Sequence, residues 1–397
     1  MIMRKRHSRL LCHLTLCLSC MVSHVWGENL QLHGFVAQGL IQARNSNFVN
    51  DDGDVSVKLT EAGINASYRI SSRIRVAGQG VYLNGGNRYP EGARLDYLFV
   101  DWQWVNSLDW QVNLYLGRNK NYHWLYSSTR DVPHTRPSII LPQSIYFDVF
   151  RDVALGSDGV ALRASTSNDF GDWDINWSYG TSNISLEQTK NILNEGANGG
   201  LKHEYDHQIN LLWKPFSSQY QLGFNILDSE FSYRQGKQDV FVNGTARTQR
   251  LMFNFAFFSE NWDIASELVR ERVVFENILF LGFNNDSIAE GGYVQGQYYV
   301  SREVNLIARL DLFDRDRKDR MGRNIELLSG GMVPGYFGFM DQATVGLSWA
   351  FADNMQLRGE YHRIKGAGRL SPVLSPNVLL NNEKYWNMWA LQLMYWF

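Results

Sequence analysis

Apolar and polar residues alternate in many short runs along this chain, and a period of two is typical of β-strands with one apolar face. In Val304–Leu312, for example, every second residue is valine, leucine or alanine, and Arg309 and Asp311 lie between them. Runs of this kind predict sixteen strands, at 31–43, 55–70, 73–84, 93–104, 109–119, 156–166, 172–181, 203–214, 219–231, 247–259, 261–271, 291–300, 303–314, 340–351, 354–365 and 386–397. The chain is therefore expected to be all-β.

The connections between these strands alternate between short and long. The short ones are 70–73, 105–109, 168–171, 215–218, 259–261, 300–303 and 351–354, and the long ones are 44–54, 84–92, 120–155, 182–202, 232–246, 272–290, 315–339 and 366–385. A closed antiparallel transmembrane β-barrel has this asymmetry, with short periplasmic turns and long extracellular loops. Its apolar face is turned to lipid and its polar face to a water-filled lumen, the reverse of a soluble sandwich.

The last predicted strand alternates up to the final residue of the chain. Leu393, Tyr395 and Phe397 share one face of it. A strand at this position needs a partner, and we expect it to pair with 31–43 and close the barrel. A terminal phenylalanine after alternating apolar residues also resembles the signal that the outer-membrane barrel-assembly machinery reads, so these three residues are the candidate assembly signal.

The first residues have the pattern of a targeting segment. Four basic residues precede an apolar stretch at 10–22, and small residues follow it, which predicts a cleaved secretory signal peptide at 1–27 and a single barrel domain at 28–397. An N-terminal anchor and a lipoprotein modified at Cys20 are the alternatives. All three cysteines lie inside this segment. No later stretch has 18 consecutive apolar residues, which excludes a helical membrane protein.

Composition and charge narrow the function further. Aromatic residues make up 14% of the chain, which suits many strands in an amphipathic setting. Without the four basic residues of the targeting segment, 34 basic residues face 40 acidic ones, a net charge of −6 that gives no argument for nucleic-acid binding. The acidic clusters Asp51–Asp54 and Asp314–Arg320 lack a recognised ligand spacing, so we expect neither a metal site nor a cofactor.

The connection 120–155 is the candidate functional segment. It is long, rich in apolar residues and stiffened by three prolines, so we expect it to fold into the lumen as a constriction loop. The candidate constriction residues are its charges, with about half acting as structural pins, and three wall arginines: Arg130, Asp131, Arg136, Asp148, Arg151, Asp152, Arg75, Arg94 and Arg118. Tyr122, Trp124 and Tyr126 are candidate aromatic contacts for a solute, or else anchors of the loop.

These features together resemble the Gram-negative general porin superfamily, and the resemblance in architecture spans the chain after the signal peptide. The stretch Gly117–Asp148 also resembles uncharacterised porin-like proteins of gammaproteobacteria. The resemblance implies a third external loop that narrows the pore, acids on that loop facing a basic wall, and a homotrimer. This loop carries as many arginines as aspartates, which leaves the ion selectivity open.

A barrel of about 16 strands is wide enough for an aqueous channel. We therefore expect a bacterial outer-membrane porin for passive diffusion of small hydrophilic solutes or ions, with membrane lipid and lipopolysaccharide as surroundings. The alternatives are a sugar-type channel with an aromatic lining, a barrel enzyme and a surface receptor. An enzyme requires a nucleophile beside a base, and no spacing singles out Ser348 and His362 for those roles.

Overall fold

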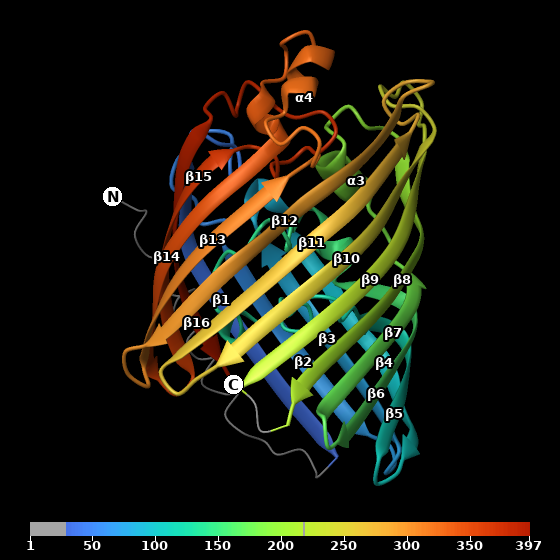
Figure 1. Ribbon diagram of the computed structural model, residues 1–397, viewed down its shortest axis with the longest axis vertical. Helices are drawn as coiled ribbons and strands as arrows, with labels where there is room; N and C mark the ends of the chain where they lie inside the picture. The colour runs from blue at the N-terminus through green and yellow to red at the C-terminus, as the bar shows by residue number, and fades with distance from the viewer. Residues whose placement is uncertain (1–28, 217–218) are drawn as a thin grey trace, which may run out of the picture.

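Sixteen antiparallel strands form the wall of the molecule (Figure 1). The computed structural model describes residues 29–216 and 219–397, and the predicted signal peptide lies outside the described residues. The strands are β1 (Leu30–Arg44), β2 (Thr60–Arg69), β3 (Ile74–Asn84), β4 (Gly92–Asn106), β5 (Trp110–Lys120), β6 (Gly156–Asn168), β7 (Gly171–Thr181), β8 (Gly200–Pro215), β9 (Tyr220–Arg234), β10 (Gly244–Phe258), β11 (Trp262–Glu276), β12 (Asn284–Tyr299), β13 (Val304–Asp314), β14 (Phe339–Ala352), β15 (Met355–Gly366) and β16 (Tyr385–Trp396). Their number and order confirm the sequence prediction.

Each strand pairs with its neighbour in sequence, and β1 pairs with β16 to close the barrel. In this last pair Leu40 lies opposite Leu391. The ladder continues to the end of the chain, because the backbone N–H of Gly34 donates to Phe397 O at 3.0 Å and the N–H of Phe397 donates back at 2.9 Å. Closure leaves no strand edge, as a barrel in hydrocarbon requires.

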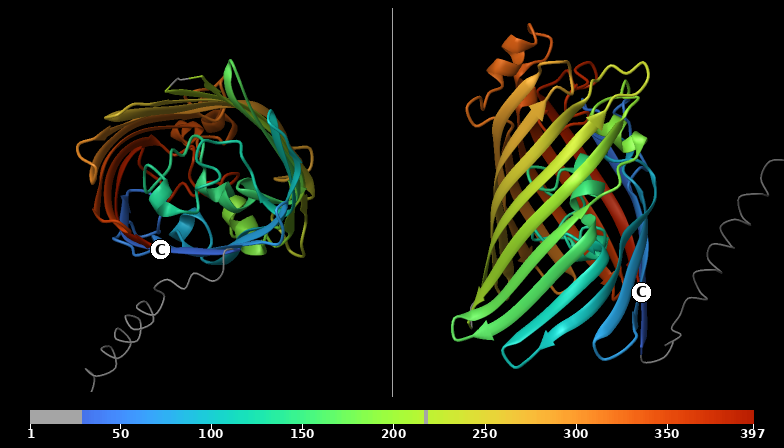
Figure 2. Two further views of the ribbon diagram at one scale, coloured as in Figure 1. Left: turned by 90° about the horizontal axis from the view of Figure 1, so that it is seen from below. Right: turned by 90° about the vertical axis from the view of Figure 1, so that its right-hand side faces the viewer.

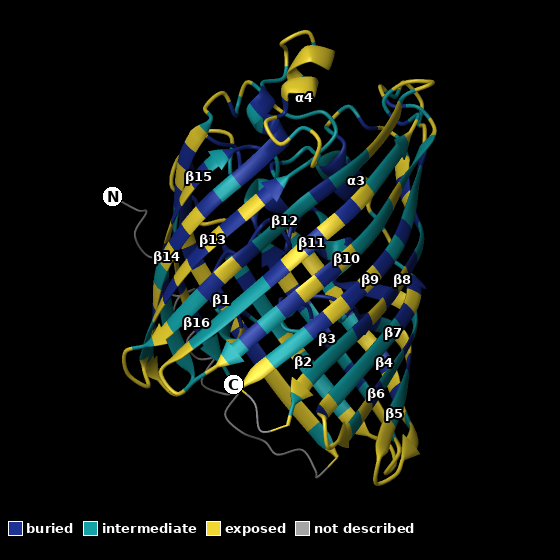
Figure 3. Ribbon diagram, in the orientation of Figure 1, coloured by how far each residue is buried: buried dark blue, intermediate teal, exposed yellow. Residues whose placement is uncertain are grey.

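Exposed and buried positions alternate along the strands (Figure 3). In β13, Leu306, Leu310 and Leu312 are 42–59% exposed on the outer face, whereas Arg309 and Asp311 are at most 2% exposed. Apolar side chains therefore cover the outside and charged side chains point inward. This arrangement buries the apolar band in lipid and places the polar groups in the lumen.

The short turns lie at one end of the barrel and the long loops at the other (Figure 2). The long loops contain η1 (Gly86–Arg88), η2 (Pro133–Thr135), η3 (Asp148–Phe150), α2 (Arg151–Ala154), α3 (Leu186–Ile192), α4 (Arg323–Leu328) and η4 (Gly335–Gly338). None of the helices in the described ranges is long and apolar enough to cross a membrane.

Several strands extend beyond their predicted ends on the side of the long loops. The clearest case is β12, which begins at Asn284 rather than 291 and pairs with β11 from Asn284 onward. Its first residues, Asn284 to Ser287, are polar on both faces, so no alternation marks them as strand. Strand β2 differs in the other direction and begins at Thr60 rather than 55.

Candidate functional site: a loop folded across the lumen

The third long loop, residues 121–155, folds into the barrel (Figure 2). Its regular structure consists of the short helical turns η2, η3 and α2. Most of its side chains are buried, including Ile140 at 1% and Tyr146 at 0% exposure. The infolding predicted from its apolar content and prolines is therefore confirmed.

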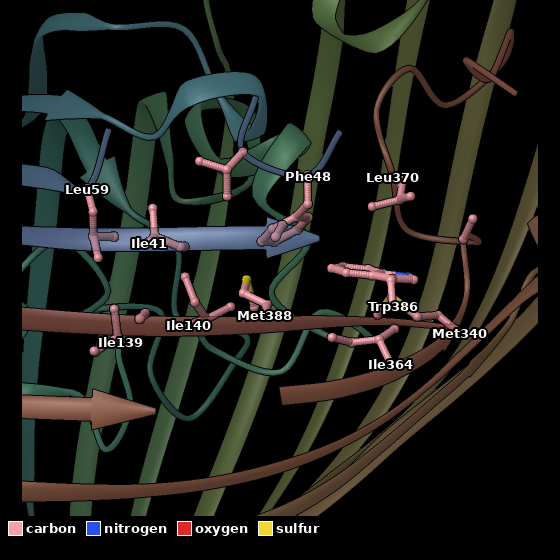
Figure 4. Close-up of a cluster of buried hydrophobic side chains, with 14 of the residues drawn as sticks. Ile41, Phe48, Leu59, Ile139, Ile140, Met340, Ile364, Leu370, Trp386 and Met388 are labelled. Carbon is pink, nitrogen blue, oxygen red and sulfur yellow. The ribbon is translucent and has the colours of Figure 1, made fainter. Parts of the chain in front are cut away.

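Apolar packing fixes this loop near the seam of the barrel. Ile139 and Ile140 belong to a buried cluster with inward-facing side chains of β1, β14, β15 and β16 (Figure 4). The wall contributes Ile41, Met340, Ile364, Trp386 and Met388. Burial of one isoleucine side chain contributes about 1.5–3 kcal/mol, so this contact alone favours the docked loop.

Two carboxylates on the inner wall bind backbone N–H groups of the loop. Glu360 on β15 accepts hydrogen bonds from Ile139 N–H and, at 3.2 Å, from Ile140 N–H. Glu267 on β11 accepts one from Leu125 N–H at 2.9 Å and one from the Tyr146 hydroxyl at 2.6 Å. These hydrogen bonds satisfy backbone groups in both arms of the loop, which would be costly to leave buried without a partner.

Two arginines on the wall donate to the loop in the same way. Arg309 on β13 donates to Ser138 Oγ at 3.0 Å and to Ile140 O at 2.8 Å. Arg358 on β15 donates to Pro133 O at 3.1 Å. Strands that follow the loop in sequence thus satisfy several of its backbone groups.

On the opposite side, a network of ion pairs lies within the loop and connects it to β2, β4, β5 and η1. The pairs are Lys120–Asp96, Lys120–Asp131 (3.0 Å), Arg151–Asp131, Arg136–Glu61 (2.9 Å), Arg130–Asp148 (2.5 Å), Arg88–Asp148 (3.5 Å) and Arg94–Asp152 (3.1 Å). Most of these side chains are buried. Pairing is what makes burial of so many charges tolerable.

Asp131 and Asp148 of this network are ionised at neutral pH. Burial on its own would raise the pKa of Asp148, but Arg130 and Arg88 outweigh burial and hold that pKa below its ordinary value. The pKa of Asp131 is held well below its ordinary value by Arg151 and Lys120, again against burial. The ion pairs of both residues therefore remain intact at neutral pH.

All six charges predicted on the loop have an ion-pair partner: Arg130, Asp131, Arg136, Asp148, Arg151 and Asp152. Five of the six are buried. In this conformation they connect the loop to itself and to the wall. These contacts therefore position the loop.

The three predicted wall arginines lie in different places. Arg94 pairs with Asp152 of the loop. Arg75 points into the lumen, pairs with Asp101 at 2.8 Å and keeps 46% of its side chain exposed. The register places Arg118 opposite Leu98 and Asp158, both exposed on the outer face, so Arg118 does not join the lumen residues.

The three predicted aromatic contacts also differ. Trp124 is 6% exposed and packs against Tyr146, and Tyr126 packs against the same ring, so both anchor the loop. Tyr122 is partly exposed, and its ring lies 3.8 Å from the guanidinium of Arg163 on β6. The hydroxyl of Tyr122 accepts a hydrogen bond from Arg163 Nη1 at 3.0 Å.

The inner wall of β7 to β10 carries a row of asparagines. Asn176 Nδ2 donates to Asn210 Oδ1 at 3.0 Å, and Asn210 donates in turn to Asn225. The row continues to Asn254 on β10, whose side chain lies over Gly223 and occupies the space that a Cβ there would fill. Asn225 Nδ2 and Asn254 Oδ1 have no partner among the described residues.

Sequence reasoning missed some of the groups in this site. Lys120, Arg88 and Arg163 were not singled out, although Lys120 bridges two buried aspartates. It also missed a second infolded loop at 367–384, which packs against the cluster around Ile192. This loop has the same signature as the first: prolines among apolar residues, here Pro372, Pro376, Leu370, Val373 and Leu374.

The structure also shows the surroundings of the residues considered for an enzyme. His362 contacts Gln342, Thr344 and Glu360. Ser348 donates to Asn305. Within residues 29–216 and 219–397, no group of three or more histidine, cysteine, aspartate or glutamate residues is placed to hold a metal ion.

Solved structures with this architecture are outer-membrane proteins. OmpT of Vibrio cholerae in its trimer form superimposes with a TM-score of 0.59 at 11% identity, covering 93% of this chain and 99% of that one. OmpF of Salmonella typhi superimposes with a TM-score of 0.57 at 13% identity, covering 93% of this chain and 98% of that one. The anion-selective porin of Comamonas acidovorans superimposes with a TM-score of 0.54 at 9% identity, covering 93% of this chain and 99% of that one. The chain has a porin-like fold. At these identities the similarity concerns the fold alone, and no protein-family model or curated protein sequence matches the chain.

Proposed function

We propose that this protein is a bacterial outer-membrane channel for passive diffusion of small hydrophilic solutes or ions, and that residues 121–155 limit its bore. Support comes from the apolar outer face, the polar lumen and a strand number wide enough for water. The porin neighbours agree with this proposal. Membrane lipid and lipopolysaccharide would surround the barrel, and the trimer form of OmpT makes a homotrimer the assembly to test first.

The asparagine row is the observation that carries the proposal. The loop makes ion pairs with the wall at β2, β4 and β5, and hydrogen bonds at β8 (Asn121 to Asp206) and at β11 to β15. The asparagine row on β7 to β10 presents uncharged amides instead. Asn225 Nδ2 and Asn254 Oδ1 have no protein partner among the described residues, and buried groups of this kind are ordinarily satisfied by water. We place the aqueous path along this row, with Tyr122 and Arg163 on its border.

Single-channel recording of the refolded barrel in a planar bilayer tests the proposal. We expect stepwise conductance in KCl, and we expect Asn254→Leu to lower it by about half or more, because an apolar group in a narrow pore disfavours water. Phe253→Leu is the matched control, since Phe253 is the neighbouring residue on the outer face of β10. A folded barrel without conductance would refute the proposed channel function. Equal conductance in both variants would show that the aqueous path does not follow the asparagine row.

A salt gradient in the same recording reports ion selectivity. Most charges on the loop and on the facing wall are paired, so we expect a reversal potential near zero, with weak selectivity at most. A sugar-type channel is the second candidate, favoured by Tyr115 and Tyr122 on either side of Arg163. It predicts that a sugar added to the bath blocks the current and that Tyr122→Ala abolishes the block.

A further inference from the structure

A cavity of about 380 Å³ lies on the extracellular side of the infolded loop. Its floor is the loop 121–155, its wall is the inner face of β8 to β13, and its cover is α3 with the segments 315–338 and 368–376. This volume falls in the range of sites for small organic ligands. The covering loops are held in place, because Val373 N–H donates to Ile192 O at 2.9 Å.

Most of the lining is apolar, and much of it is aromatic. Five phenylalanines come from the floor and the wall: Phe147, Phe150, Phe231, Phe275 and Phe313. Leucine and isoleucine side chains of α3 and β8 add to them. A lining of this kind favours a ligand with an apolar body over a fully hydrated solute.

Two arginines in the lining, Arg315 and Arg369, form no ion pair with any described residue. Arg369 donates to Ser144 O at 3.0 Å, and its guanidinium lies 3.6 Å from the centre of the Phe313 ring. Its buried Nε has no hydrogen-bond partner in residues 29–216 and 219–397. Arg315 donates to Val373 O at 3.2 Å. Among the described residues, neither guanidinium has a carboxylate oxygen within ion-pair distance. Burial lowers the pKa of Arg369 to about 10, so it remains charged at neutral pH.

The carboxylates that line the same cavity are already engaged. Glu271 pairs with Arg250. Asp206 accepts hydrogen bonds from the side-chain amides of Asn121 and Gln208. Asp316 and Asp319 accept them from backbone N–H groups of their own loop. The charges left to meet a ligand are therefore the two guanidinium groups.

We propose that this cavity binds a small carboxylate with an apolar body, whose carboxylate meets Arg315 and Arg369 while the body lies among the phenylalanines. An arginine fork matches a carboxylate in geometry and charge. Binding itself does not depend on the proposed function; only the step from bound ligand to transported solute rests on it. The channel would then take up hydrophobic carboxylates in preference to other small solutes.

Isothermal titration of the refolded barrel tests the binding, with benzoate as probe, benzamide as its uncharged counterpart and acetate as an anion without the apolar body. We expect benzoate to bind at least about tenfold more tightly than either comparison compound. Benzamide lacks the charge-assisted hydrogen bond to arginine, and acetate lacks the buried ring. Arg315→Gln and Arg369→Gln should each weaken benzoate by about tenfold and leave benzamide unchanged. Arg272→Gln, on the outer face of β11, is the matched control.

Equal affinities for benzoate and benzamide would overturn the proposal, because they would mean apolar partitioning without charge recognition. Unchanged benzoate affinity in both cavity variants, or no heat of binding at millimolar benzoate, would also overturn it. Heat-modifiable electrophoretic mobility confirms that each variant has folded. A barrel that conducts KCl but does not bind benzoate refutes only this inference, whereas a barrel that binds benzoate without conducting refutes only the channel.

Discussion

Arg309 offers a direct test of how the loop 121–155 is held. It is 2% exposed and donates to Ser138 Oγ at 3.0 Å and to Ile140 O at 2.8 Å. Methionine has a similar length and no donor, so Arg309→Met removes both contacts and leaves the carbonyl of Ile140 without this partner. A hydrogen bond to a charged group contributes about 1.5–3 kcal/mol.

The loss of two such hydrogen bonds is partly offset by relaxation of the loop. We therefore take about 3 kcal/mol as the net destabilisation of the docked loop. Each 1.4 kcal/mol changes an equilibrium constant tenfold, so the undocked population should rise about a hundredfold. The barrel itself should remain folded, because the backbone ladder of β13 with β12 and β14 does not involve the Arg309 side chain.

A cysteine at Ser144 reports the undocked state. Ser144 is 1% exposed, and its Oγ is without a hydrogen-bond partner within the described part of the chain, so Ser144→Cys is a small change in the docked loop. The three natural cysteines lie at 12, 17 and 20, so a barrel refolded from residue 28 contains this thiol alone. Its rate of modification by a charged methanethiosulfonate follows the undocked population when docking is fast.

We expect Arg309→Met to raise this rate about a hundredfold and Arg309→Lys, which keeps the charge but not the fork, about tenfold. Arg272→Met, on the outer face, should leave it unchanged. A rise of less than about threefold in Arg309→Met would refute the view that these two hydrogen bonds seat the loop.

Three further predictions concern the path, the pH response and the seam. Gly223→Ala should lower the conductance by about half, since its Cβ would collide with Asn254 Oδ1 and push that amide into the lumen; an unchanged conductance would contradict the proposed path. Burial and two neighbouring guanidinium groups lower the pKa of His134 to about 4, so the docked loop favours its neutral form and loses stability as the pH falls from about 6.5 to 4. Current noise should increase as the pH is lowered through that window, and it should increase less in His134→Gln. Equal pH profiles of the two proteins would exclude His134 as the source of the pH response. Deletion of Phe397 removes two ladder hydrogen bonds with Gly34 and should lower the free energy of unfolding, measured by urea titration, by about 2 kcal/mol. An unchanged urea midpoint would show that the β1–β16 seam does not need these two hydrogen bonds.

The strand pattern was predictable because one physical rule, apolar outside and polar inside, acts on every strand within the membrane. The rule does not apply to strand residues with polar side chains on both faces, and there the prediction failed. Asn284 to Ser287, which begin β12, are the example. The infolding of 121–155 was also predictable, since apolar residues and prolines in a loop favour a buried, stiff conformation.

The pairing of the site could not be predicted in the same way. Lys120 lies at the end of β5, and nothing in its sequence neighbours indicates that Asp96 and Asp131 meet there. Such contacts depend on how the loop crosses the lumen, which alternation does not encode. The outward position of Arg118 depends likewise on its register with β4 and β6.

The distribution of loop contacts along the chain has a consequence for biogenesis. The loop follows β5, but Glu267, Arg309 and Glu360, which bind its backbone, belong to strands that come later, and Ile139 packs beside the β1–β16 seam. A partly assembled barrel would have the ion pairs with β2, β4 and β5 but would lack these later contacts to its own loop. Its bore would therefore be widest before completion. Closure of the barrel and docking of the loop then occur in the same step, so an assembly intermediate should conduct more than the finished channel.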